Sequence, residues 1–195
     1  MLEKIKVLFA QKMQTQISAE ELLPTILQKA ALIICHSLLN GNKILSSGSG
    51  FSSVHAQYFT DHMMHGFKNE RPSLPSISVS VKSLFLPTMN NDQGFNDIEA
   101  KQIRALGKKG DVLLAISTYG NCGNIVKAVE TAMKRGMIIV ALTGHAGGVI
   151  ASLLGQQDIE IRIPSDNHAR IEEMHMFIVH CLCELIEDDL FPKHG

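Results

Sequence analysis

One stretch decides the fold: Gly110-Asp111-Val112-Leu113-Leu114-Ala115-Ile116-Ser117-Thr118-Tyr119-Gly120-Asn121-Cys122-Gly123-Asn124. Its apolar run, Val112 to Ile116, has the length of a strand that is buried on both faces. Small and polar residues follow, and apolar residues then recur at helical spacing from Ile125 to Met133. The stretch predicts a buried strand, a tight hydroxyl-rich loop and the beginning of a helix.

The loop of this unit has the features of an anion site. A helix N-terminus presents unpaired backbone N–H groups and the positive end of the helix dipole. Ser117 and Thr118 add hydroxyl donors, and Gly120 and Gly123 let the backbone approach a ligand closely. Two interpretations stay open at this point: a phosphate cradle, or an ordinary polar turn between a strand and a helix.

Length and composition limit the class of protein. A chain of 195 residues with 45% hydrophobic residues can form one α/β domain with a full core. Because 18 basic residues face 19 acidic ones, for a formal net charge of −1, we expect no direct nucleic-acid binding. The four cysteines lack metal-site spacing and no signal peptide precedes them, which predicts reduced thiols in a cytoplasmic protein. No apolar stretch reaches the roughly 20 residues that cross a bilayer, so we expect a soluble protein without membrane contact.

Two helices are predicted ahead of the first strand, within residues 1–40. The first runs from Met1 to about Gln16. Ser18 and Glu21 have the spacing of a capping box that begins the second, in which Pro24 marks a break or a first-turn position. Since these helices cannot belong to a βα repeat, they either build a subunit interface or cover the sheet.

Strands and helices alternate over residues 41–195. This pattern predicts one doubly wound α/β domain. A second Gly/Ser turn, Ser47 to Ser53, follows the first strand and opens onto a helix. In a parallel sheet both turns lie at the carboxyl edge, where such sheets bind ligands. The expected strands are Lys43–Ser46, Ser76–Val81, Val112–Ile116, Met137–Leu142 and an edge strand, Asp158–Ile163.

Four motifs of the sequence occur together in one known family. They are Ile116-Ser117-Thr118-Tyr119-Gly120-Asn121, Gly48-Ser49-Gly50-Phe51-Ser52, Leu142-Thr143-Gly144 with Gly147-Gly148, and Arg170-Ile171-Glu172-Glu173-Met174-His175. Over essentially the whole chain they resemble the sugar isomerase (SIS) domain family. This family includes the bacterial phosphoheptose isomerases and a non-catalytic class that associates with the replication initiator DnaA. The stretches Lys101 to Gly107, Glu173 to Met176 and Asp189 to Pro192 look like the initiator-associating class.

The resemblance implies a flavodoxin-like, three-layer α-β-α sandwich around a five-stranded parallel sheet. It also implies a homotetramer of SIS domains with phosphosugar sites at the strand ends, near subunit interfaces. The helices of residues 1–40 would form part of the oligomer interface. It places candidate ligand-binding residues in three loops: Gly48, Ser49, Gly50 and Ser52; Asn91 and Asp92; Ser117, Thr118, Tyr119, Gly120, Asn121 and Cys122. Asparagine-rich loops are also common turns, so both interpretations of Asn91 and Asp92 stay open. In the isomerases, a histidine and a glutamate four residues apart, with a glutamine and a histidine on the last helix, perform the proton transfers and often hold zinc.

This chain departs from the isomerase pattern. The first pair corresponds to Tyr58 and His62, and the second to Glu172 and His180, so three of the four positions differ. Tyrosine is a poor base near neutral pH, and histidine cannot supply the charge of a carboxylate. In the phosphate loop, Tyr119 and Cys122 replace serines; the tyrosine is expected to fill part of the pocket. The departures predict that no residue acts as an isomerase catalyst.

Histidines and carboxylates offer one candidate metal set. His62, Glu172 and His180 would suit zinc or iron if they converge, as the resemblance suggests. The alternative is a polar cleft whose histidines are satisfied by neighbours or water, with no cofactor. His55 and His65, on the same helix as His62, are expected at the solvent or at an interface.

The chain end offers a candidate partner surface. Glu187-Asp188-Asp189 places acidic groups at a helix C-terminus, where they oppose the dipole. Leu190 and Phe191 follow, and Pro192 stops the helix. The two apolar residues either tuck against their own subunit or anchor a partner, and the resemblance favours the anchor.

Two functional hypotheses remain. The first is a non-catalytic, homotetrameric module that binds DnaA, promotes timely initiation of chromosome replication and senses a phosphosugar. The alternative is a phosphoheptose isomerase that acts on sedoheptulose 7-phosphate.

Overall fold

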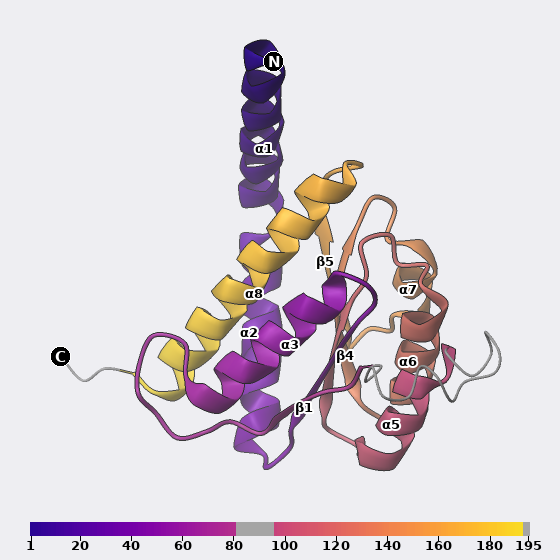
Figure 1. The fold of residues 1–195 in the computed structure, drawn as a ribbon. Helices are drawn as coiled ribbons and strands as arrows, with labels where there is room; N and C mark the ends of the chain where they lie inside the picture. Colours follow the sequence, from indigo (N-terminus) through magenta and orange to yellow (C-terminus); the bar gives the residue numbers. More distant parts are fainter. Residues whose placement is uncertain (81–95, 193–195) are drawn as a thin grey trace.

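A five-stranded parallel sheet forms the centre of the protein. The structure is a computed structural model that describes residues 1–80 and 96–192 (Figure 1). The strands lie in the order β2-β1-β3-β4-β5, and each pairs in parallel with its neighbour. This is the flavodoxin-like order, with β5 at an edge as predicted. The strand bounds are Ile44–Gly48 (β1), Ser76–Ser78 (β2), Val112–Ile116 (β3), Ile138–Gly144 (β4) and Ile159–Ile163 (β5).

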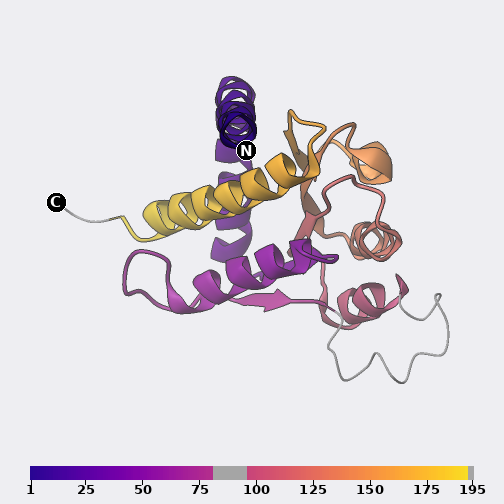
Figure 2. The ribbon, with the colours of Figure 1, turned by 45° about the horizontal axis from the view of Figure 1, so that its top comes forward.

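Helices cover both faces of the sheet, as Figures 1 and 2 show from two directions. One face carries α2 (Pro24–Leu39), α3 (Ser52–His65) and α8 (His168–Leu190). The other face carries α5 (Ile98–Leu106), α6 (Gly123–Lys134) and α7 (Gly148–Leu153). The predicted three-layer α-β-α sandwich is therefore confirmed.

The central strand β3 is buried on both faces, as its apolar run predicts. Val112, Leu114 and Ile116 belong to the core cluster beneath α2, α3 and α8. Leu113 and Ala115 belong to the cluster beneath α5 and α6. All five are fully buried. The alternation follows from the two-residue period of a strand, so β3 connects the two halves of the core.

The N-terminal helices are present, but the capping-box prediction is wrong. Helix α1 (Leu2–Leu22) continues through Ser18 and Glu21, because nothing between Gln16 and Leu22 interrupts its backbone hydrogen bonds. The chain bends at Leu23, and Pro24 begins α2, where its missing N–H costs no bond. This confirms the first-turn alternative for Pro24. Figure 1 shows α1 projecting beyond the sheet.

A search of the described residues finds no single helix that is long and apolar enough to span a membrane. Helices α1 and α2 meet the length and composition test only as a pair, and they are bent by 66° at their junction.

The segment between α3 and β2 is fastened to α8 by one carboxylate. Glu187 accepts hydrogen bonds from the backbone N–H groups of Phe67, Lys68 and Asn69 at 2.8–3.0 Å. Arg71 adds a bond from its Nε at 3.0 Å. Burial acts to raise the pKa of Glu187, but these donors outweigh burial and hold the pKa below the usual value of a glutamate. These bonds explain why an acidic residue occupies a position near the C-terminus of α8: the Glu187 carboxylate holds the segment between α3 and β2 in place.

Candidate functional site

Two strand-to-helix turns meet at the carboxyl edge of the sheet. The β1–α3 turn contains Gly48, Ser49 and Gly50, and the β3–α6 turn contains the residues from Ser117 to Cys122. Because β1 and β3 are hydrogen-bonded neighbours, the two turns lie side by side. In this strand order, the helices leave β1 and β3 on opposite faces, which opens a crevice between them.

The β3–α6 turn is locked against the beginning of α7. A Cβ atom on Gly120 would overlap the carbonyl oxygen of Gly147, so glycine is needed there for a backbone contact. The side-chain oxygen of Asn121 accepts a hydrogen bond from the Val149 N–H at 2.9 Å. Gly120 and Asn121 were expected to serve a ligand, and the structure gives both of them a packing role.

The remaining residues of this turn divide into buried and exposed groups. Ser117 and Thr118 are 1% and 7% exposed, and the Ser117 hydroxyl has no partner among the described residues. Cys122 stands at the N-cap of α6. The Tyr119 ring is 42% exposed and lies beside the rings of His145 and His168. Tyr119 therefore stands on the surface of this turn, and the expectation that it fills part of the phosphate pocket stays a prediction.

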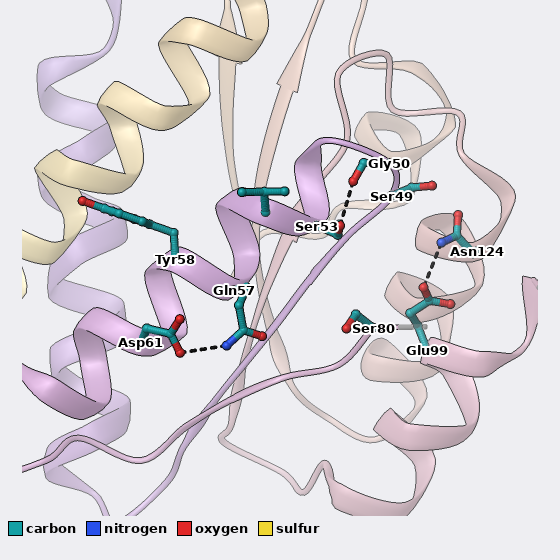
Figure 3. Close-up of a pocket in the computed structure, with 11 residues that line it drawn as sticks. Ser49, Gly50, Ser53, Gln57, Tyr58, Asp61, Ser80, Glu99 and Asn124 are labelled. Atoms are coloured by element: carbon teal, nitrogen blue, oxygen red, sulfur yellow. Dashed lines mark hydrogen bonds between the residues drawn. The ribbon is translucent and has the colours of Figure 1, made fainter. Parts of the chain in front are cut away.

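The β1–α3 turn opens a cleft of about 460 Å³ (Figure 3). Gly48 is required in this turn, because a Cβ atom would overlap the Ser52 backbone. Ser52 itself is buried, and Ser53, one residue later, lines the cleft in its place. The complete lining is Gly48, Ser49, Gly50, Ser53, Val54, Gln57, Tyr58, Asp61, Ser80, Glu99 and Asn124.

Three of the four isomerase-equivalent residues lie together. The Tyr58 hydroxyl is 3.2 Å from His180 Nε2, and the Tyr58 and His62 ring centroids are 4.3 Å apart. In Figure 3, Tyr58 points from α3 toward α8. Glu172 has a different neighbour, because its carboxylate is 3.5 Å from His168 Nδ1. The group that the resemblance assigns to catalysis is thus a Tyr–His–His cluster.

The candidate metal set is not assembled in the structure. Within residues 1–80 and 96–192, no three His, Cys, Asp or Glu side chains are placed to hold a metal ion. His62 Nδ1 donates to the Gly66 carbonyl oxygen at 3.0 Å, His180 faces Tyr58, and Glu172 faces His168. These contacts match the alternative, in which the histidines are satisfied by neighbours.

His55 is buried within its own chain, so the expectation that it lies at the solvent or at an interface is wrong. It is 1% exposed, and its ring centroid lies 6.4 Å from that of His175, which is 0% exposed. His175 Nε2 donates to the Thr143 carbonyl oxygen at 3.0 Å. Burial lowers the pKa of His55, and burial lowers the pKa of His175 to about 4. Both imidazoles are neutral near pH 7.

Leu190 and Phe191 pack against their own chain. Both are partly buried against the core cluster of α2, α3 and α8. The Arg71 guanidinium lies 5.6 Å from the centre of the Phe191 ring. The structure therefore has the tucked arrangement, and the anchor interpretation is corrected to that extent. Asn91 and Asp92 lie outside the described residues.

Sequence reasoning missed Glu99, which lies deep in the cleft. Its Oε1 accepts a hydrogen bond from Asn124 Nδ2 at 2.9 Å, and the residue is 1% exposed. The sequence holds one indication that Glu99 is buried: it lies one helical turn before Ile103, on the same face of the helix, and Ile103 is also buried. Burial raises the pKa of Glu99, against the lowering effect of the Asn124 hydrogen bond.

Comparison with known proteins agrees with this geometry. Residues 9–144 match the family model described as SIS domain. Over 192 residues the chain is 58% identical to the DnaA initiator-associating protein DiaA of Erwinia tasmaniensis and 56% identical to that of Salmonella paratyphi B, with 98% of each chain covered. The fold is similar to a phosphoheptose isomerase from Francisella tularensis, with a TM-score of 0.90, 42% identity and coverage of 96% of this chain and 98% of that one. It is also similar to phosphoheptose isomerase GmhA from Neisseria gonorrhoeae, with a TM-score of 0.87, 36% identity and the same coverage.

Proposed function

The chain belongs to the SIS domain family, and we propose that it is a non-catalytic member that binds the replication initiator DnaA and promotes timely initiation of chromosome replication. The observation that carries this proposal is the identity of 56–58% over 98% of the chain with proteins named for association with DnaA. Such similarity along the whole length supports a shared partner as well as a shared fold.

The chemistry of the cleft supports a non-catalytic role. Aldose–ketose isomerisation needs a base that removes a proton from carbon and an acid that serves the oxygens. At the positions that the resemblance assigns to this task, the structure has a phenol and two imidazoles, with Tyr58 paired to His180. The carboxylate of Glu172 faces His168. A tyrosine hydrogen-bonded to histidine is a weak base near neutral pH.

We propose a homotetramer as the working form. Helix α1 exposes Leu2, Ile5, Val7, Leu8, Phe9, Met13 and Ile17, which is more apolar surface than a lone subunit covers. A groove of about 770 Å³ between α1, α2 and α8 adds a second apolar surface, which includes Phe177 and Leu185. A symmetric assembly would cover both surfaces. It would also present four copies of each DnaA contact, so that weak contacts act together.

We further propose that the cleft binds a phosphosugar without converting it. The hydroxyl of Ser49 and the N-terminus of α6, whose residue Asn124 lines the cleft, supply donors that a phosphate group accepts. The proposed setting is the cytoplasm, with protein and sugar-phosphate partners and without direct contact to nucleic acid or membrane.

The test is direct capture of purified DnaA by the immobilised protein, followed by surface plasmon resonance. We expect saturable binding that persists without DNA. An unrelated SIS domain of the isomerase class is the control and should capture none. Absence of binding at micromolar DnaA would refute the proposed partner. In cells, deletion of the gene should make the number of origins per cell irregular in replication run-off flow cytometry.

Phosphoheptose isomerase is the second candidate function. The 42% identity with the Francisella tularensis enzyme and the presence of His180 at the end of the Tyr–His–His cluster favour it. Consumption of sedoheptulose 7-phosphate by the purified protein decides between the two.

A further inference from the structure

The cleft lies at the switch point of the sheet, between the carboxyl ends of β1 and β3. Helix α3 forms one wall, and the first turns of α5 and α6 form the other (Figure 3). Ser49, Gln57 and Ser80 line it with hydroxyl and amide groups. Such groups can both donate and accept hydrogen bonds, which suits a polyhydroxylated ligand.

Glu99 is the deep carboxylate of this cleft, and it is only half satisfied. Its Oε1 accepts from Asn124 Nδ2 at 2.9 Å. Its Oε2 is buried and has no hydrogen-bond partner among the described residues, although the residue lines the cleft. A buried acceptor without a partner costs free energy. The other deeply buried glutamate, Glu187, differs in this respect, because both of its oxygens accept hydrogen bonds.

The orientation of Glu99 is fixed from the α6 side. Asn124 is the second residue of α6, so its amide holds Oε1 beside the N-terminus of that helix. The positive end of a helix dipole stabilises a carboxylate at this place. Asn124 is 4% exposed, so the atoms packed around its side chain restrict its movement. Glu99 therefore presents Oε2 as a preorganised acceptor.

We propose that Glu99 is a specificity-determining residue of the cleft, whose Oε2 accepts a hydrogen bond from a hydroxyl group of a sugar phosphate. This inference rests on the sugar-phosphate binding proposed above and adds the group that distinguishes the sugar from phosphate alone. A ligand without a hydroxyl at this position leaves Oε2 unpaired. Discrimination comes from that penalty, as in sites that select a substrate hydroxyl.

The experiment compares two probes, sedoheptulose 7-phosphate and inorganic phosphate, by isothermal titration calorimetry on the whole protein. We expect Glu99→Gln to bind the sugar phosphate about tenfold or more weakly, because the amide nitrogen cannot accept the bond. Its affinity for inorganic phosphate should not fall. The matched control is Glu70→Gln, which makes the same exchange at an exposed position outside the cleft and should leave both affinities within about twofold.

The melting temperature separates recognition from a structural role. Since Glu99 is half satisfied, the unliganded Glu99→Gln variant should melt no lower than the original protein. A lower melting temperature with unchanged affinity for sedoheptulose 7-phosphate would overturn the inference. Equal loss of affinity for both probes would overturn it as well, because Glu99 would then act on the phosphate. If the unmodified protein bound neither probe, the proposed sugar-phosphate site would fail and this inference with it. Capture of DnaA does not enter either measurement.

Discussion

Arg71 and Glu187 form a buried ion pair that joins the segment after α3 to the last turns of α8. Arg71 Nε lies 3.0 Å from Glu187 Oε2, and each side chain is 1% exposed. Arg71 also donates to the carbonyl oxygens of His62 and Met63, at the end of α3. One pair thus fixes the position of α3, and with it the wall of the cleft that carries Gln57 and Tyr58.

Replacing Glu187 with glutamine should lower the free energy of unfolding by about 3–5 kcal/mol, because Arg71 would keep a buried charge without its partner. Urea denaturation at pH 7 measures the change. Glu184→Gln is the matched control on the same helix. Glu184 contacts Lys68 at the surface, where the two side chains are 43% and 54% exposed. Its substitution should therefore lower the free energy of unfolding by less than about 1 kcal/mol. Equal losses in the two variants would contradict this account.

Acid should destabilise the protein between pH 6.5 and about 4 through His175. The unfolded chain binds a proton with a pKa near 6.5, whereas burial lowers the folded pKa of His175 to about 4. In that window the unfolded state binds more protons, so stability falls as pH falls, by up to ~1.4 kcal/mol per pH unit for this group. His55 acts in the same direction.

Denaturation series at pH 7, 6 and 5 test the histidine effect, and His175→Gln should flatten the slope. Glu187 adds a separate loss at lower pH. Because its pKa is lowered on folding, its stabilisation is complete above the usual glutamate pKa and disappears as pH falls through the folded value. A slope that His175→Gln leaves unchanged would assign the acid effect to other groups.

The unmodified protein should not convert sedoheptulose 7-phosphate. Tyr58→His together with His62→Glu should be necessary for activity, since the pair restores a base and a carboxylate beside His180. It need not be sufficient, because Glu172 faces His168. A coupled assay of the aldose product measures turnover. Robust turnover without substitution would overturn the non-catalytic assignment and make His180 and Glu172 the next candidates for acid and base.

The last residues of the described chain should contribute more to folding stability than to DnaA binding. Phe191 packs against the core and lies under the Arg71 guanidinium, so Phe191→Ala should lower the melting temperature by a few degrees. We expect DnaA capture per folded molecule to remain. Pro192→Ala, at an exposed position, is the control. Lost capture at an unchanged melting temperature would instead identify the tail as the anchor.

The apolar surface of α1 should hold the subunits together. Phe9 is 64% exposed, so Phe9→Glu should leave the fold of one subunit intact and dissociate the assembly. Light scattering at micromolar concentration gives the mass. Gln11→Glu introduces the same charge at another exposed position of the helix and should leave the tetramer unchanged. A monomer mass for the unmodified protein would contradict the proposed assembly.

The sequence predicts those features of the fold that depend on periodicity. The apolar run from Val112 to Ile116 predicts β3 because burial on both faces leaves no polar position in it. The end of α1 could not be predicted in this way. Ser18 and Glu21 fit a capping box, but a serine caps a helix only where the backbone already turns, and here the turn comes at Pro24.

The cleft was harder to predict than the fold, because burial of a polar residue depends on elements far away in the chain. His55 is buried by α8 and the Phe51 ring, neither of which its own helical pattern reports. Glu99 meets Asn124 across 25 residues. The turn residues Gly120 and Asn121 were identified as special, yet their partners are Gly147 and Val149. The motif shows that these positions are restricted, but it does not show which distant residues they contact.

The contact between Gly120 and Gly147 joins two loops outside the cleft lining whose backbones are less free to evolve than the walls of the cleft. Gly120 cannot gain a side chain without displacing the Gly147 carbonyl, and Gly148 cannot gain one without displacing the Tyr119 carbonyl, so the two backbones can change only together. The helical walls have no such restriction: Gln57 and Glu99 can be exchanged while the backbones of α3 and α5 stay in place. New ligand preferences in this fold should therefore arise by substitutions on its helices, whereas the loops that lie against one another should keep their backbone conformation.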